Sequence, residues 1–367
     1  MAVETRSGVP VQRLWVSAYE VPTDEPESDG TLEWDSTTIV VVRAHAGHHL
    51  GIGYTYAPVA AASLVEEQLA PLTEGADALA PAATWERLAR ALRNAGRPGI
   101  GFCALAAVDT ALWDLKARML ELPLVDVLPR VRDEVPVYGS GGFCSYSLGR
   151  LRQQLRRWVK GGIPRVKIKI SREPERDPER LDLARSAIGD GAELLVDANG
   201  ALRPKEAIAW AQRLRSEWGV TWFEEPVSSA DFDGLRRIRD AAPGGLEIAA
   251  GEYAYVPADF RNLVGSVDCL QADVTRCGGY TGLLQAAGLA AAHGLDLSGH
   301  CAPQLSVHGF CAVAAARHLE YFHDHVRVES LLFDGVLEPV EGALRPDRSR
   351  PGHGLELKGG DAERYAV

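Results

Sequence analysis

Three acidic residues recur at nearly equal intervals in the second half of the chain. Asp197, Glu224 and Glu252 lie 27 and 28 residues apart, and each follows a short apolar run. That interval is the length of one strand and helix repeat, so the three carboxylates should project from neighbouring parallel strands and converge. Converging carboxylates repel one another unless a cation lies among them. Because all the ligands would be oxygens, the spacing predicts a Mg²⁺ site rather than a zinc site, which prefers His or Cys.

Two lysines stand in a run that is typical of a buried strand. Lys167 and Lys169 are two residues apart, so both side chains point to the same face. Neighbouring ammonium groups are expected to lower each other's pKa, which would make a lysine a general base near neutral pH. The alternative is that both amines extend to solvent. The flanking Val166, Ile168 and Ile170 argue against it, because they indicate a strand buried on both faces.

A histidine and two further acids complete the set of polar residues at predicted strand ends. Asp273 and His300 are 27 residues apart, which places them on neighbouring strands, where the carboxylate can fix the tautomer of the imidazole and raise its basicity. The alternative for His300 is a structural histidine in the core. Facing Lys169 from the opposite side of the substrate, His300 is expected to act as a second base or as an acid. Glu320 stands in the last predicted strand.

Eight short apolar runs alternate with helical windows after Pro136, and they carry all of these residues. Several windows open with proline at an early position, as helices often do. Eight strand and helix units predict an α/β fold with a (β/α)8 barrel, whose active site lies at the carboxyl ends of the strands. The runs are VPVYG, RVKIKI, ELLVDAN, TWFEEP, EIAAGE, CLQAD, DLSGH and HLEYF, and the windows span residues 151–160, 178–188, 204–217, 232–240, 257–263, 279–293 and 304–317.

The first third of the chain has a different pattern. Residues 9–20 and 37–57 are rich in β-branched and aromatic residues and predict an antiparallel sheet with a hairpin at HAGHHLG. Residues 59–120 have helical periodicity. The predicted domains are an α+β capping domain at 1–130, the barrel at 131–328, and a Gly- and Pro-rich tail at 329–367 that returns to the capping domain.

Composition narrows the class of protein. Lys plus Arg total 39 and Asp plus Glu 50, a formal net charge of −11, and no basic block exceeds two residues, so nucleic acid is not expected as a partner. The six cysteines form no Cys-x-x-Cys pair, and residues 1–15 have no apolar signal core. The stretch 297–316 has no Asp, Glu, Lys or Arg, but it contains two histidines. We expect a cytoplasmic enzyme with no membrane partner.

The motifs KIK, VDAN, EEP, AAGE, LQADVTRCGG and LSGH, in this order, resemble those of the mandelate racemase and muconate lactonizing enzyme family of the enolase superfamily. The resemblance implies a homo-oligomeric enzyme that uses Mg²⁺ and a Lys or His base on a small carboxylate substrate. The His–Asp pair is similar to the mandelate racemase and acid-sugar dehydratase branch. The implied roles are Mg²⁺ ligation by Asp197, Glu224 and Glu252, base catalysis by Lys169 assisted by Lys167 and by His300 with Asp273, hydrogen bonding of the substrate carboxylate by Glu320, and a substrate contact by Asn199.

In that family two loops of the capping domain set specificity, and here they correspond to residues 20–34 and 53–58. The second supplies Tyr54 and Tyr56 as candidate substrate-binding residues. The alternative is that both loops are plain surface turns. Two groups of histidines are interpreted as exposed turn residues and not as metal ligands, namely His45, His48, His49, His323 and His325.

Two reactions fit this set of residues, and both begin with removal of the proton α to a carboxylate. The first is dehydration of an acid sugar, an aldonate or aldarate, to a 2-keto-3-deoxy acid, and the alternative is racemisation or epimerisation of a 2-hydroxy acid. Polar residues of the predicted loops favour a polyol over a phenyl ring. An inactive barrel that serves as a binding or assembly protein is a third hypothesis, which predicts missing catalytic groups. The polar loop residues are Thr23, Asp24, Glu25 and Ser28, with the two tyrosines.

Overall fold

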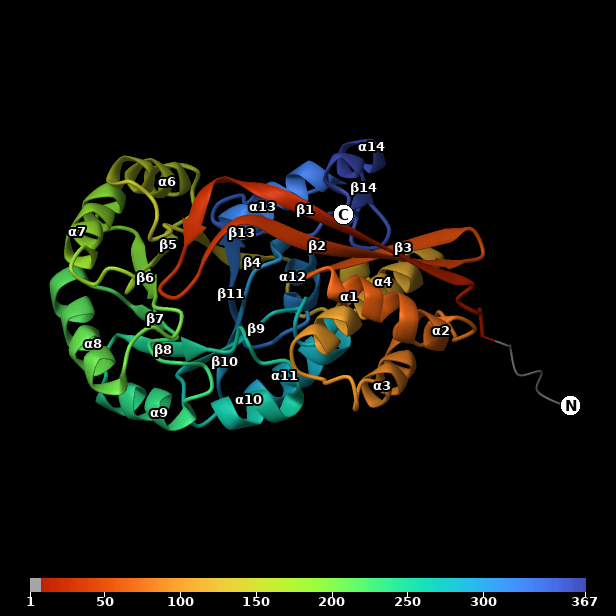
Figure 1. Cartoon of the computed structure of the whole chain (residues 1–367), viewed down its shortest axis with the longest axis horizontal. Coiled ribbons are helices and arrows are strands. Elements are labelled where there is room, and N and C mark those ends of the chain that lie inside the picture. The colour runs from red at the N-terminus through yellow and green to blue at the C-terminus, as the bar shows by residue number, and fades with distance from the viewer. Residues whose placement is uncertain (1–7) are drawn as a thin grey trace, which may run out of the picture.

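The computed structural model describes residues 8–367, so the stretch searched for a signal sequence lies partly outside the described residues. Eight parallel strands form a closed barrel, as the sequence predicts. They pair in chain order, and the last pairs with the first through Leu319 and Val137. Figure 1 shows helices around these strands. The strands are β4 (Val135–Gly141), β5 (Arg165–Lys169), β6 (Glu193–Asp197), β7 (Trp222–Glu224), β8 (Glu247–Ala250), β9 (Cys269–Ala272), β10 (Asp296–Gly299) and β11 (Ala316–Phe322).

Each barrel strand is followed by a helix. Side chains fix two of the helix starts: Ser147 Oγ accepts a hydrogen bond from Arg150 N, and the Asp231 carboxylate accepts one from Gly234 N. Proline occupies the first turn of four others, where its missing N–H is not needed. The helices are α6 (Leu148–Lys160), α7 (Asp177–Ile188), α8 (Pro204–Trp218), α9 (Phe232–Ala241), α10 (Pro257–Leu263), α11 (Gly279–Ala292), α12 (Pro303–Phe310) and α13 (His323–Leu332).

The last predicted helical window is too long. The pattern predicts a helix over 304–317, but α12 ends at Phe310 and β11 begins at Ala316, which pairs with Leu297 of β10. The alanines of this segment suit either structure by propensity, so pairing with the neighbouring strand decides. Residue 328, the predicted end of the barrel, lies within α13.

The capping domain is built on a three-stranded antiparallel sheet. The strands are β1 (Arg13–Ser28), β2 (Glu33–Ala46) and β3 (His49–Tyr56). Glycine in β3 lets α4 (Ile100–Met119) approach the sheet closely, since a Cβ on Gly53 would lie 2.3 Å from Ala111 N. The other helices are α1 (Ala60–Leu64), α2 (Ala70–Thr73), α3 (Pro81–Ala91) and α5 (Leu124–Val127), with a π-helix at Val65–Leu69.

The two segments expected as capping loops belong to this sheet. Residues 20–34 form the far end of the β1–β2 hairpin, where Glu27 pairs with Trp34. Residues 53–56 lie inside β3. The expectation of loops is therefore wrong, because both segments pair with β2, and their polar composition does not reveal that pairing.

The C-terminal tail contacts both domains. It holds β12 (Phe333–Asp334), β13 (Ala343–Leu344), β14 (Glu356–Leu357), α14 (Gly359–Ala362) and a 3-10 helix at Glu363–Tyr365. β13 pairs with β4 of the barrel. His353 Nε2 lies 2.7 Å from Ile52 O of β3, and Val367 N donates to Ala18 O of β1 at 3.1 Å. The tail therefore links the barrel to the capping sheet.

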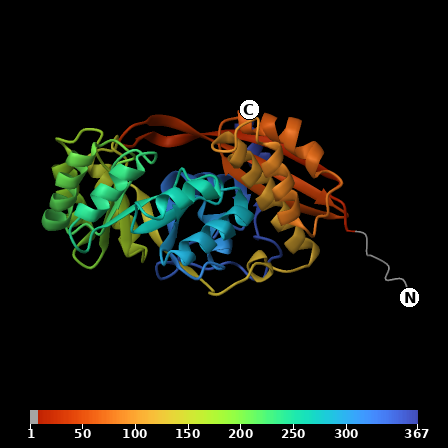
Figure 2. The ribbon, with the colours of Figure 1, turned by 90° about the horizontal axis from the view of Figure 1, so that it is seen from below.

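The β1–β2 hairpin extends from the capping domain over the barrel, as Figures 1 and 2 show. At its turn, Gly30 lies against the ends of two barrel strands, where a Cβ would be 2.3 Å from Ala198 O and 2.9 Å from Ile170 O. Ser28 O accepts a hydrogen bond from Cys144 N at 2.8 Å. The hairpin thus covers the edge of the barrel at which the active site is predicted.

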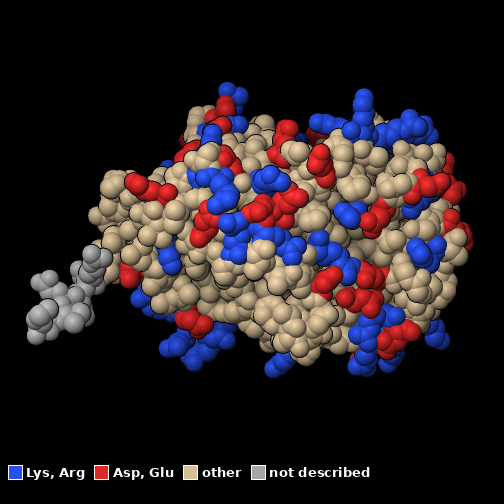
Figure 3. Space-filling view, turned by 180° about the vertical axis from the view of Figure 1, so that it is seen from behind, with Lys and Arg blue, Asp and Glu red and all other residues tan. Residues whose placement is uncertain are grey.

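Charges of both signs share the surface. On the face drawn in Figure 3, Lys and Arg side chains are interspersed with Asp and Glu. Within residues 8–367, no helix is both long enough and apolar enough to cross a bilayer. The six cysteines all lie in that range as free thiols, five of them buried and Cys144 partly exposed.

Gly30→Ala should lift the hairpin turn from the barrel, because the backbone oxygens that face this position cannot move aside as a flexible side chain would. Amide hydrogen exchange, measured by mass spectrometry, should rise in residues 22–36 while the barrel stays protected. Gly191→Ala is the control, since nothing lies within 4 Å of a Cβ at Gly191. Unchanged exchange in the hairpin of the Gly30→Ala protein would contradict this packing.

Candidate active site

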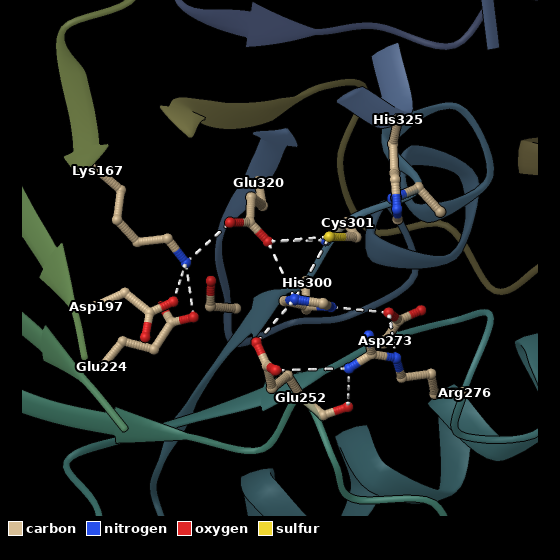
Figure 4. A network of polar contacts seen from close by, with 12 residues as sticks. Lys167, Asp197, Glu224, Glu252, Asp273, Arg276, His300, Cys301, Glu320 and His325 are labelled. Carbon is tan, nitrogen blue, oxygen red and sulfur yellow. Dashed lines mark hydrogen bonds and ion pairs between the residues drawn. The ribbon is translucent and has the colours of Figure 1, made fainter. Parts of the chain in front are cut away.

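The predicted catalytic and metal-ligating side chains gather at the carboxyl ends of the barrel strands (Figure 4). All are buried, and the most exposed, Lys169 and His300, are 5% exposed. Each comes from a different strand end, apart from the lysines, which share one strand. They are Lys167 and Lys169 in β5, Asp197 in β6, Glu224 in β7, Glu252 after β8, Asp273 after β9, His300 after β10 and Glu320 in β11.

Asp197, Glu224 and Glu252 form one carboxylate cluster. Each offers an oxygen within 4.8 Å of the oxygens of the other two, and no residue of the three is more than 3% exposed. Three buried oxygens at this separation can share one divalent cation. Because every donor is a carboxylate oxygen, the cluster fits Mg²⁺, which favours hard oxygen ligands and keeps positions for water or substrate.

The two lysines form ion pairs with two of these carboxylates and with Glu320. Lys169 Nζ lies 2.5 Å from Asp197 Oδ2, and Lys167 Nζ lies 2.6 Å from Glu224 Oε1 and 2.8 Å from Glu320 Oε1. Burial disfavours both ammonium ions, but the carboxylates raise the pKa of each lysine well above its ordinary value. In this structure attraction to the carboxylates outweighs repulsion between the ammonium groups, and a lowered pKa beside a bound metal stays a prediction.

The pKa values of two carboxylates in the cluster are shifted in opposite directions. Burial and the nearby Asp197 raise the pKa of Glu224 to about 7. Burial also opposes ionisation of Glu252, but His300, whose Nε2 lies 3.0 Å from Glu252 Oε2, holds the pKa of Glu252 well below its ordinary value. A cation among the three would favour the ionised form of each.

His300 is oriented by Asp273. The imidazole Nδ1 lies 2.8 Å from Asp273 Oδ2, and Thr275 donates to Asp273 Oδ1 from both its N and its Oγ1 at 2.7 Å. Burial disfavours the imidazolium, but the Cys301 thiol, Glu252 and further carboxylates raise the pKa of His300 well above its ordinary value. The contact makes Nδ1 the donor to Asp273 and leaves Nε2 facing the carboxylate cluster.

Lys169 and His300 approach the cluster from different sides. β4 and β11 separate β5 from β10 on one side of the barrel, and four strands separate them on the other. The strand diametrically opposite β5 is β9, which is followed by Asp273. A substrate bound at the cluster would therefore have an amine on one side and an imidazole on the other.

Glu320 is an ionised acceptor in this structure. Burial opposes its charge, but Lys167 and His300 lower the pKa of Glu320 below its ordinary value. Cys301 N donates to Glu320 Oε2 at 3.1 Å. An ionised carboxylate accepts hydrogen bonds and donates none, so the implied hydrogen bond to a substrate carboxylate requires Glu320 to take up a proton first.

Arg276 and Glu225 also belong to the site, although the sequence reasoning gave neither a role. Arg276 Nη1 lies 3.6 Å from Glu252 Oε1, and its Nε lies 3.6 Å from Asp273 Oδ2. Burial and the nearby Glu252 raise the pKa of Glu225 well above its ordinary value. The signal was present in the motifs LQADVTRCGG and EEP, each of which places a further charged residue beside a strand end.

Three aromatic residues, Tyr54, Tyr56 and His325, pack against other parts of the fold. Tyr54 is fully buried, and its hydroxyl donates to Glu329 Oε1 at 2.6 Å, so that hydroxyl is already engaged. Tyr56 stacks on His325, with ring centroids 3.4 Å apart. The expectation of an exposed His325 is wrong, because this residue is buried at the start of α13 and its Nδ1 accepts a hydrogen bond from Ala302 N.

The outer side of the hairpin carries two of the predicted loop acids. Asp24 Oδ2 lies 2.6 Å from Arg150 Nη2, and Glu25 Oε1 lies 3.4 Å from Arg150 Nε. The side chains are 35% and 50% exposed. Paired with one arginine and open to solvent, these acids anchor the hairpin to α6.

Two buried residues of the hairpin hold polar atoms that remain unpaired. Glu27 and Ser28 are buried, and within residues 8–367 Glu27 Oε1 and Ser28 Oγ have no hydrogen-bond partner. The buried Oδ1 of Asn199, the predicted substrate contact, has none either, while Asn199 O accepts from Thr31 Oγ1 of the hairpin turn at 3.4 Å. Nothing in the sequence distinguished Glu27 from the other acids of the segment.

The two parts of the chain match two parts of one enzyme family. Residues 20–129 match the mandelate racemase / muconate lactonizing enzyme N-terminal domain, and residues 150–362 match the enolase C-terminal domain-like description. The chain therefore belongs to the mandelate racemase and muconate lactonizing enzyme family, as its motifs indicate.

Relatives of this chain match it over nearly its full length. A 3,6-anhydro-alpha-L-galactonate cycloisomerase of Streptomyces coelicolor is 31% identical over 95% of this chain and 97% of its own. An arabinonate dehydratase of Saccharolobus solfataricus is 29% identical over 96% of this chain and 98% of its own. Among solved structures, a mandelate racemase/muconate lactonizing enzyme-like protein from Rubrobacter xylanophilus has 59% identity and a TM-score of 0.97, covering 98% of this chain and 100% of that one. A racemase from Streptomyces coelicolor A3(2) with bound magnesium has 31% identity and a TM-score of 0.91, covering 97% and 100%.

Glu224→Gln should weaken Mg²⁺ binding, because a neutral amide replaces one of three anionic ligands. Isothermal titration calorimetry should show a loss larger than the roughly 10- to 100-fold that follows removal of an outer partner of a metal ligand. Glu217→Gln, on an exposed side of α8, is the control. Equal Mg²⁺ affinity in the two variants would exclude Glu224 as a ligand.

Proposed function

We propose that the protein is a Mg²⁺-dependent dehydratase that converts an acid sugar, an aldonate or aldarate, to a 2-keto-3-deoxy acid. The observation that carries the proposal is a pair of proton-transfer groups beside one carboxylate cluster, Lys169 of β5 on one side and His300 with Asp273 on the other. The arabinonate dehydratase of Saccharolobus solfataricus, which spans the same length, supports dehydration as the reaction.

The first step removes the proton α to the substrate carboxylate. Asp197, Glu224 and Glu252 would hold Mg²⁺, which when bound supplies a Lewis acid and the positive charge that the lysines give the cluster in this structure. Lys169, as the free amine, takes the α-proton as a general base. Lys167, within 2.8 Å of Glu320, keeps a positive charge close to the developing negative charge on the substrate.

The second step expels the β-hydroxyl. His300, as the imidazolium held by Asp273, protonates this hydroxyl as it departs as water. The electron pair left by the α-proton forms the bond between the α- and β-carbons while the bond to oxygen breaks. The resulting enol tautomerises to the 2-keto-3-deoxy acid, and His300 is left neutral.

Unpaired buried polar atoms of the hairpin and the barrel support a polyol substrate. Glu27 Oε1, Ser28 Oγ and Asn199 Oδ1 are buried without partners in the described chain, although buried polar atoms normally have hydrogen-bond partners. Sugar hydroxyls would supply them, whereas a phenyl ring would not. Burial and then the nearby Asp324 raise the pKa of Glu27 to about 9, so its neutral carboxyl group can also donate a hydrogen bond.

Racemisation of a 2-hydroxy acid is the second candidate, and a cluster of aromatic rings favours it. Trp34 of the hairpin packs edge-on against Phe143 with ring centroids 5.6 Å apart, and Phe143 packs in the same way on Phe322. The cluster includes Cys301, whose Sγ lies 3.4 Å from His300 Nε2. Apolar rings near the imidazole suit an aromatic substituent on the substrate. The similarity to the racemase from Streptomyces coelicolor A3(2) also supports this hypothesis.

With Mg²⁺ present, at least one member of a panel of hexonates, pentonates and aldarates should yield a 2-keto acid, detected as its semicarbazone. His300→Asn should lower the rate by roughly 10²–10⁴-fold, because the departing hydroxyl loses its acid. His48→Asn, on the exposed β2–β3 turn, is the control. Turnover of mandelate, followed by polarimetry, with no keto product from any sugar acid would replace this proposal with the second candidate.

Glu27→Leu should lower kcat/KM for the sugar acid by roughly tenfold, because substrate hydroxyls would lose a buried hydrogen-bond partner. Glu27→Gln keeps a donor and an acceptor of similar size and should retain most of the activity. Glu25→Leu, the control, removes an exposed acid from the same hairpin. Equal kcat/KM values for the two leucine variants would show that Glu27 does not contact the substrate.

A further inference from the structure

Three side chains of different chemistry meet beside the carboxylate cluster. Cys301 Sγ lies 3.4 Å from His300 Nε2 and 3.4 Å from Glu320 Oε2, and His300 Nε2 lies 3.5 Å from the same Glu320 oxygen. None of the three residues is more than 5% exposed. Figure 4 shows them side by side, His300 and Cys301 from the loop after β10 and Glu320 from β11. The thiol has no role in the proton transfers proposed above.

The separations between these atoms match those in a tetrahedral zinc site. Zinc bonds of roughly 2.3 Å to sulfur and roughly 2.0–2.2 Å to nitrogen and oxygen, at tetrahedral angles, place the ligand atoms about 3.3–3.6 Å apart. All three separations here fall in that interval. A zinc ion could therefore bind with little movement of the three side chains.

Neighbouring groups already orient the three donors. Asp273 Oδ2 accepts the Nδ1 proton of His300 at 2.8 Å, which is the carboxylate–histidine pairing of many zinc sites. It turns Nε2 toward the thiol and Glu320, with Glu252 Oε2 also 3.0 Å from this nitrogen. Thr275 in turn holds Asp273. Cys301 N donates to Glu320 Oε2 at 3.1 Å, so the thiol and the carboxylate are held on the same side.

We propose that His300, Cys301 and Glu320 form a binding site for a thiophilic divalent cation, Zn²⁺ or its analogue Cd²⁺, which lies next to the Mg²⁺ cluster and uses none of its three ligands. On binding, the thiol releases its proton to solvent, and the thiolate and carboxylate together balance the charge of the cation. Sulfur and imidazole donors select such metals, whereas the cluster of Asp197, Glu224 and Glu252 offers only the oxygens that suit Mg²⁺.

Occupation of this site would stop the reaction. The metal takes the Nε2 atom with which His300 transfers a proton, and it ties up Glu320 as well. This consequence rests on the proposed function, whereas the site itself does not. The structure therefore assigns to Cys301 a regulatory role, since it converts a catalytic histidine into a ligand for an inhibitory metal.

Cd²⁺ is the direct probe of the site, because a cadmium thiolate absorbs in the ultraviolet and the aqueous ion does not. Titration of the full-length protein in saturating Mg²⁺ should give one equivalent of this charge-transfer band. Cys301→Ser and Cys301→Ala should lack it, while Cys144→Ser, which removes a partly exposed thiol elsewhere, should retain it. His300→Asn should weaken Cd²⁺ binding at least tenfold. Absence of the band in the wild-type protein, its persistence in both Cys301 variants, or its loss when Mg²⁺ is raised further would overturn the proposal.

Zinc inhibition tests the consequence separately. With a sugar acid that is turned over, the Zn²⁺ concentration for half inhibition should rise at least tenfold in Cys301→Ser, each variant being compared with its own rate without zinc. Equal sensitivity of the two proteins would overturn the inhibitory role. A cadmium band without turnover of any sugar acid would support the metal site and refute the proposed function, so the two failures are distinguishable.

Discussion

The acidic side chains of the active site are buried, so nearby cations must compensate their negative charges. Five ion-paired carboxylates meet at one end of the barrel, none belonging to a residue more than 3% exposed. Unpaired, each would cost several kcal/mol of stability. The barrel resolves this by placing cationic groups on alternate sides of the acids, with ion pairs between 2.5 and 3.6 Å. The acids are Asp197, Glu224, Glu252, Asp273 and Glu320, and the cations are Lys167, Lys169, Arg276 and His300.

The capping hairpin covers these charged side chains and shields them from water. Its turn fits against the strand ends because Gly30 has no side chain, and the polar side chains of Glu27 and Ser28 are buried. Exclusion of water strengthens every electrostatic interaction beneath it. The tail contributes indirectly: by pairing with β4 and bonding to β1 and β3, it fixes the capping sheet relative to the barrel. The strands of this hairpin are 16 and 14 residues long. Because an isolated hairpin is only marginally stable, it needs such support from the rest of the fold.

Much of this architecture could be predicted because it depends on periodicity. Apolar runs that alternate with helical windows predict the barrel. The spacing of Asp197, Glu224 and Glu252 corresponds to one strand and helix repeat per carboxylate. The pKa of Lys169 could not be predicted, because it depends on which opposite charge lies nearest in space, and Asp197 is 28 residues away. The hairpin was missed for a similar reason: backbone pairing, which leaves little trace in the residues of 20–34, decides between strand and loop. Only contacts across the fold distinguish Glu27 from the exposed Glu25.

The same positioning that suits His300 to proton transfer also suits it to bind a soft metal. Both roles require Nδ1 to be engaged and Nε2 to face the site, and Asp273 achieves this for both. A change at Asp273 would therefore disturb the two functions together. Cys301 separates them, because its sulfur supplies a ligand to a thiophilic cation and no proton to the substrate. A smaller or oxygen-bearing residue at this one position would leave the hard oxygen cluster intact and remove the soft site, so the metal specificity of this end of the barrel depends on a single thiol.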